Sequence, residues 1–99
     1  MEQYDENSTV IQDQHFHGPK DNFYNTTVEN IRYAEASFLG VNFTNVVLNH
    51  VVFDSCYLQD CKFTNILSSK TFFRNSTLIR PYFSDTDIYE YRSVPISAG

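Results

Sequence analysis

The sequence has little of what most catalytic and nucleotide-binding sites require. Its three glycines are scattered, so there is no glycine-rich phosphate-binding loop. No apolar run approaches the roughly 18–20 residues that a membrane-spanning helix needs, and the polar, acidic first 15 residues do not form a signal peptide. No serine or cysteine is paired with a histidine in a pattern typical of nucleophilic catalysis. We therefore predict a protein that is not an enzyme and that carries no cofactor.

Positive charge is also scarce, with 7 Lys and Arg against 12 Asp and Glu, for a formal net charge of -5. Residues 1–20 carry a net -3, and residues 21–92 carry eight acidic and six basic side chains. This near-neutral body offers no basic stripe to nucleic-acid phosphates and no strong acidic field. We expect no nucleic-acid partner. A DNA-mimicking inhibitor of a topoisomerase is kept as an alternative function, beside a structural solenoid that binds no ligand.

What the sequence does contain is a period of five, from residue 21 to about residue 92. Thirteen of the fourteen residues reached by stepping from Phe23 are large and apolar, and Ser68 is the exception. Two positions before each of them lies a second series of small or β-branched residues. Neither a strand period of 2 nor a helix period of 3.6 gives this spacing. The period therefore indicates a structural repeat.

Four pentads that each turn the chain by about 90° close one square coil of about 20 residues, so residues 20 apart stack. The expected core columns then contain Phe23, Phe43, Phe63 and Phe83 in one wall and Phe53 and Phe73 in another. Register resumes after Ser68, so this residue is a substitution within the repeat. The sequence predicts an all-β fold, a right-handed quadrilateral β-helix (a pentapeptide-repeat solenoid) of about 3.5 coils.

The flanks lack this period. We interpret residues 1–20 as a flexible leader, with an N-terminal cap over the first coil as the alternative, and residues 21–92 as the β-helix. Residues 93–99 are interpreted as a C-terminal tail, because Pro95 cannot donate a ladder hydrogen bond.

Cysteine and histidine are too few for a metal site. Cys56 and Cys61 both fall in the small inward series, where cysteine is a good core residue, and successive walls meet only at a corner. His15 and His17 could share one face of a strand but have no third ligand. We predict two buried core thiols and ordinary loop histidines.

Four N-x-S/T sequons predict N-linked glycans and a luminal or extracellular location. Three of the four asparagines point outward in the phase of the repeat, where the fold can accept a glycan. The candidate glycosylation sites are Asn7, Asn25, Asn42 and Asn75.

The candidate protein-binding surface is the last strand of the repeat, together with outward apolar residues. An unpaired edge strand offers its backbone to a partner strand. The residues concerned are Tyr82, Ile88, Tyr89 and Tyr91 at the edge, and Val52 and Phe72 in the patch.

The segments 38–41, 64–77 and 83–92 resemble the large luminal loop of synaptic vesicle glycoprotein 2, which lies between the seventh and eighth spans of a major-facilitator-type membrane protein. The resemblance implies a square β-helix that carries N-glycans, faces the lumen of a synaptic or secretory vesicle, and is exposed at the cell surface after fusion. It also implies a protein partner, the receptor-binding domain of botulinum neurotoxin A-type toxins.

Two departures from the family pattern are visible. This chain has one more pentad between Phe38 and Thr64, and it leaves the repeat at Val94, where the family continues with further pentads and another glycosylation site. Because the toxin contacts in the family lie largely on that last coil, they are not carried over to residues of this chain.

Overall fold

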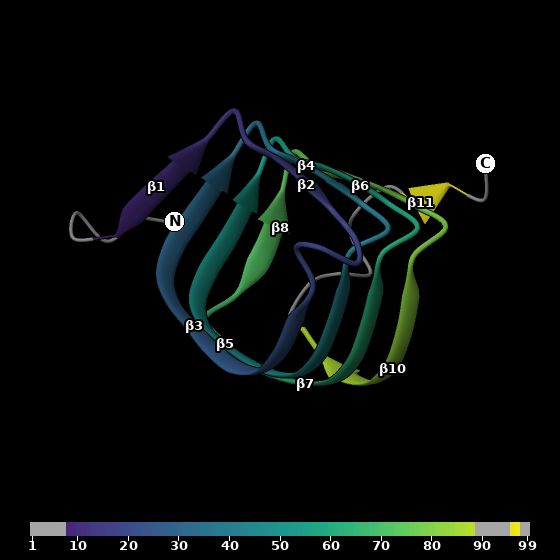
Figure 1. Ribbon diagram of the computed structural model, residues 1–99. Helices are drawn as coiled ribbons and strands as arrows, with labels where there is room; N and C mark the ends of the chain where they lie inside the picture. Colours follow the sequence, from purple (N-terminus) through teal and green to yellow (C-terminus); the bar gives the residue numbers. More distant parts are fainter. Residues whose placement is uncertain (1–7, 89–95, 98–99) are drawn as a thin grey trace.

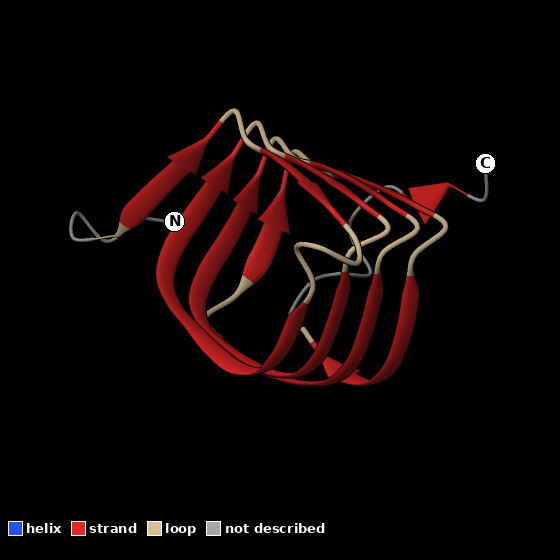
Figure 2. Cartoon of the chain, in the orientation of Figure 1, coloured by secondary structure: helices blue, strands red, loops and turns tan. Residues whose placement is uncertain are grey.

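The fold, described by a computed structural model over residues 8–88 and 96–97, consists of parallel strands wound around one interior (Figures 1 and 2). Five strands form the path β1-β3-β5-β7-β10 of the first sheet, β8 pairs with β5 at its side, and the second sheet runs β11-β9-β6-β4-β2. The strands are β1 Thr9–Gln12, β2 His15–His17, β3 Phe23–Ala34, β4 Ser37–Leu39, β5 Asn42–Asp54, β6 Tyr57–Gln59, β7 Lys62–Ser69, β8 Phe72–Arg74, β9 Thr77–Ile79, β10 Tyr82–Asp87 and β11 Ile96–Ser97.

The register between neighbouring coils is 20 residues, which confirms the coil of four pentads. Phe23 pairs with Phe43, Phe43 with Phe63, and Phe63 with Phe83. Leu48 pairs with Ser68, so Ser68 stays in register as expected. The predicted all-β solenoid is confirmed, with about four turns.

The corners of the coils depend on a left-handed backbone conformation that recurs every five residues. From Asn25 to Asp85, the residue two positions after the central residue of each pentad has φ between 50° and 64°. Asn, Asp and Gly adopt this conformation at the lowest cost. These corner residues are Asn25, Asn30, Glu35, Gly40, Asn45, His50, Ser55, Asp60, Asn65, Lys70, Asn75, Arg80 and Asp85.

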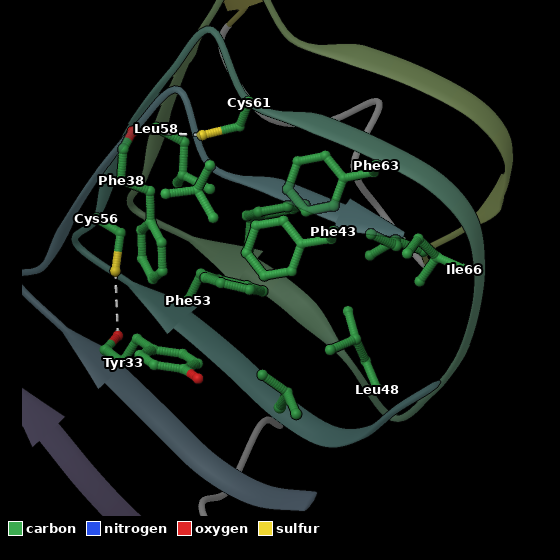
Figure 3. Close-up of a cluster of buried hydrophobic side chains, with 14 of the residues drawn as sticks. Tyr33, Phe38, Phe43, Leu48, Phe53, Cys56, Leu58, Cys61, Phe63 and Ile66 are labelled. Atoms are coloured by element: carbon green, nitrogen blue, oxygen red, sulfur yellow. Dashed lines mark hydrogen bonds between the residues drawn. The ribbon is translucent and has the colours of Figure 1, made fainter. Parts of the chain in front are cut away.

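The interior is filled by the central residues of the pentads (Figure 3). The ring centroids of Phe23 and Phe43 lie 4.6 Å apart, those of Phe43 and Phe63 4.7 Å apart, and those of Phe63 and Phe83 5.2 Å apart. The inner rings are buried, whereas Phe23 and Phe83 are half-buried because they lie in the first and last full coils. Phe53 stacks on Phe73 at 4.9 Å in a second column, and both are buried.

The boundary expected at residue 21 is corrected by the structure. β1 pairs with residues 31–34 of β3 and β2 pairs with β4, so residues 9–17 add part of a coil below the first complete one. Phe16 stacks on Phe38 with centroids 4.7 Å apart. The register here is 22 residues, because the turn at residues 18–21 adds two, and the step of five from Phe23 therefore misses this segment.

Two residues of the tail expected at residues 93–99 pair with the second sheet. Ile96 pairs with Leu78 and Ser97 with Ile79, a register of 18 residues that lies outside the period of 20. No helix long and apolar enough to cross a bilayer occurs among the residues described.

Small polar residues of the inward series link successive coils. The hydroxyls of Thr71, Ser76 and Thr86 each lie within hydrogen-bond distance of two carbonyls, one 23 residues earlier and one two residues earlier, which share the single hydroxyl proton. Thr71 and Ser76 are almost fully buried, and their hydroxyls also accept the amide N–H groups of Val51 and Cys56. The polar atoms are thereby satisfied inside the apolar interior.

Candidate functional site

Two of the candidate glycosylation sites lie at exposed corners of the solenoid. Asn25 and Asn75 both have φ of 50° and exposed side chains. Asn42 lies on β5, is half-buried, and donates its backbone N–H to Oδ1 of Asn22 at 2.9 Å. Asn7 is outside the described residues. The fold thus leaves the side chains of two sequons open to solvent and that of a third partly so.

The corners at residues 25, 45 and 65 stack on one another and carry a ladder of asparagine side chains. Nδ2 of Asn65 donates to Oδ1 of Asn45 at 2.6 Å, and Nδ2 of Asn45 donates to Oδ1 of Asn25 at 3.0 Å. Each amide therefore donates to the coil before its own. The sequence reasoning missed this ladder, although three asparagines 20 residues apart were its signal.

The candidate binding edge is β10, the last strand on the path of the first sheet. Tyr82 begins the strand and is 54% exposed, so it is accessible as expected. Ile88 is only 2% exposed because it occupies the inward column above Ser68, which corrects its assignment to the surface. Tyr89 and Tyr91 are outside the described residues. At this end the described residues therefore offer the exposed side chain of Tyr82 on the last strand of the sheet path.

The apolar patch expected on the outer face is also corrected in part. Val52 is 4% exposed, because it lies between its ladder partners Arg32 and Phe72, and Phe72 is half-buried. The guanidinium of Arg32 forms an ion pair with Asp54 at 3.1 Å. On the neighbouring wall, Val47 and Leu67 pair and remain 38% and 65% exposed.

The comparison with known protein families matches residues 7–98 to the family described as the SV2A/B/C luminal domain. The chain belongs to this family. A search of curated proteins finds no match. The predicted resemblance is thereby confirmed, and it places the domain on the luminal side of a membrane, the side that the family description states.

Within this luminal domain, the thiols of Cys56 and Cys61 are free and buried. The sulfur of Cys56 contacts the carbonyl of Tyr33 at 3.2 Å, and that of Cys61 contacts the carbonyl of Phe38 at 3.3 Å (Figure 3). Burial raises the pKa of each thiol to about 11. Since the thiolate is the reactive form, both groups are protected by exclusion from solvent and by protonation.

We expect neither cysteine of the folded domain to react with a thiol reagent such as DTNB at pH 8, and both to react in denaturant. The raised pKa also predicts that the native state holds protons which the unfolded state has lost, so stability falls as the pH rises from about 9 toward 11. Thiol titration with and without guanidinium chloride, and chemical denaturation at pH 8 and 10, check both points. Fast labelling of the folded protein by DTNB would contradict the predicted protection of the two thiols.

The remaining polar clusters offer no metal site. No group of three His, Cys, Asp or Glu residues that could hold an ion occurs in residues 8–88 and 96–97. Nδ1 of His15 lies 2.6 Å from the hydroxyl of Ser37, a bond between the two sheet strands β2 and β4. At the surface, Arg80 holds Asp60 with two hydrogen bonds at 2.6 and 2.9 Å, which lower the pKa of the Asp60 carboxyl. These contacts join neighbouring coils.

Proposed function

We propose that this chain is a glycosylated, non-catalytic recognition domain on the luminal side of a major-facilitator-type vesicle membrane protein. Its protein partner binds by adding a strand to β10, and receptor-binding domains of botulinum neurotoxin A-type toxins are partners of this kind. The proposal is supported by the match of residues 7–98 to the SV2A/B/C luminal domain. The vesicle location and exposure at the cell surface after fusion belong to the same proposal.

The observation that carries the binding mode is the position of β10 at the end of its sheet. Among the residues that the structure describes, β10 pairs with β7 on one side and with no strand on the other. The backbone N–H of Tyr82 donates to the carbonyl of Cys61, and all the described ladder partners of β10 lie on β7. A partner strand can pair on the side away from β7.

The edge is held firmly enough to serve as a template. Ile88 is buried directly after β10, and the hydroxyl of Thr86 bonds to the carbonyls of Phe63 and Ser84 at 2.8 and 2.9 Å. The hydroxyl of Ser68 bonds to the carbonyl of Asp87. A strand that is ordered before binding lowers the entropic cost of association. Exposed Tyr82 supplies the side-chain contact beside it, since tyrosine is enriched among binding hot spots.

Binding of the glycosylated chain to a purified receptor-binding domain of a botulinum neurotoxin A-type toxin tests the proposal. We expect Tyr82→Ala to weaken binding about tenfold, the effect of losing one hot-spot side chain. The matched control is Tyr24→Ala, because Tyr24 is 55% exposed on β3, at the opposite end of the stack. Equal losses for both variants would contradict binding at β10, and no binding by the wild-type chain would contradict recognition of this partner.

A further inference from the structure

The N-terminal end of the first sheet contains a second unpaired edge. β1 pairs with β3 only from Ile31 onward, so the first part of β3, residues 23–30, has a neighbouring strand on one side alone within the described part of the chain (Figure 1). Tyr24 is 55% exposed there, and Phe23 is half-buried. A sheet edge with open N–H and C=O groups and apolar side chains favours pairing with another chain.

The asparagine ladder determines where the side chain of Asn25 points. Asn65 donates to Asn45 and Asn45 donates to Asn25, each toward the preceding coil. Asn25 lies in the first complete coil, where β1 does not reach, and its Nδ2 makes no hydrogen bond with any described residue. Because Oδ1 of Asn25 accepts its bond from the second coil, Nδ2 is the atom of this amide that is left without a described partner.

The same nitrogen is the atom to which an N-linked glycan is attached, and Asn25 begins the sequon that ends at Thr27. We propose that the oligosaccharide on Asn25 lies across the edge of β3 that no described strand covers, and that it prevents this edge from pairing with a second copy of the chain. This inference rests on the glycosylation that the proposed function includes. It assigns to the Asn25 glycan a role as an end cap, which solenoids need at their terminal coils.

The other exposed sequon differs in its position. Asn75 lies at the corner between β8 and β9 in the third coil, away from residues 23–30. The structure therefore gives this glycan no contact with the open edge of β3. Removal of the Asn75 glycan leaves the N-terminal end of the sheet unchanged. This removal is therefore the matched control for removal of the Asn25 glycan.

The test uses the full chain secreted from a glycosylating host. Thr27→Ala removes the sequon at Asn25 but keeps the asparagine and its ladder, and Thr77→Ala removes the sequon at Asn75; both threonines are exposed. Mass spectrometry measures the occupancy of each site, and light scattering measures association over a range of concentrations. We expect Thr27→Ala to associate at concentrations at least about tenfold lower than the wild type, and Thr77→Ala to behave like the wild type.

Three further proteins separate the effect of the glycan from that of the substitution. Thr27→Ser retains the sequon and should remain monomeric, and enzymatic removal of the glycans from the folded wild type should reproduce association without a substitution. Adding Tyr24→Lys to Thr27→Ala should restore the monomer, because a charge at the edge opposes pairing.

The outcomes separate the two proposals. A Thr27→Ala protein that stays monomeric, although Asn25 is occupied in the wild type, overturns the end-cap inference and leaves the glycosylated domain intact. An unoccupied Asn25 in the wild type overturns the inference together with glycosylation at this position. Association of Thr77→Ala to the same extent also overturns it, because the effect would then not depend on the edge of β3.

Discussion

Replacement of Phe43 by alanine is expected to lower the free energy of unfolding by about 3–5 kcal/mol. Phe43 is 1% exposed, and its ring is stacked between those of Phe23 and Phe63, nearly parallel to them at interplanar angles of 8° and 6°. Its ring also packs edge to face with that of Phe53, with centroids 6.4 Å apart. Truncation leaves a void that two coils border, and strands held by a continuous ladder on both sides have little freedom to close it. Chemical denaturation monitored by circular dichroism measures the loss.

Phe23→Ala is the matched control, because it removes the same side chain from the end of the same column. Phe23 is half-buried and stacks on Phe43 alone within that column. We expect its loss to cost about half as much as that of Phe43, since part of its surface already faces solvent. Equal costs at the two positions would show that position in the column does not matter.

The sequence predicted the repeating part of the fold well because the period of five is a direct consequence of coil geometry. Phe43 and Phe63 recur at 20 residues since they stack, and any residue in phase with them faces the interior. The same phase places the corners, where Asn and Asp are frequent because the backbone is left-handed there.

The partial coil at the N-terminus was missed because two extra residues in the turn at 18–21 change the phase. Ile11 and Phe16 are themselves five residues apart and both pack against the core, so a search that allowed one shift would have found them. The return of Ile96 to the second sheet involves a shift of two in the opposite direction. A fixed step cannot detect either change.

The errors in the candidate site have a different origin, which is that phase alone does not measure exposure. Val52 points outward by phase, yet its ladder neighbours Arg32 and Phe72 cover it, and this depends on side-chain length. Ile88 follows the edge strand but belongs to an inward column. The direction of the Asn25 amide depends on hydrogen bonds across three coils, which a local pattern does not contain.

Gly18→Ala is expected to destabilise the domain by about 1–3 kcal/mol or more, the usual cost of overpacking. A Cβ at this position would lie 1.9 Å from the carbonyl oxygen of Gly40 and 2.9 Å from Oδ1 of Asn22. The first is backbone and cannot rotate away. To relieve this clash, the turn at residues 18–21 must move away from the neighbouring coil. That movement weakens the hydrogen bond from the Gly18 N–H to the Leu39 carbonyl, now 2.9 Å long, and the bond that the Asn22 side chain accepts from the Asn42 N–H.

Gly40→Asn provides the contrast, because nothing lies within 4 Å of a Cβ at Gly40 and its φ of 64° is that of the other corners. Asparagine already occupies this conformation at Asn45 and Asn65, so the substitution should change stability by no more than about 0.5 kcal/mol. Denaturation gives the two free energies, and hydrogen exchange should show faster opening of β1 and β2 in Gly18→Ala. If Gly40→Asn were the more damaging of the two, strain at the corners would limit stability, and the close approach of the turn to the second sheet would not.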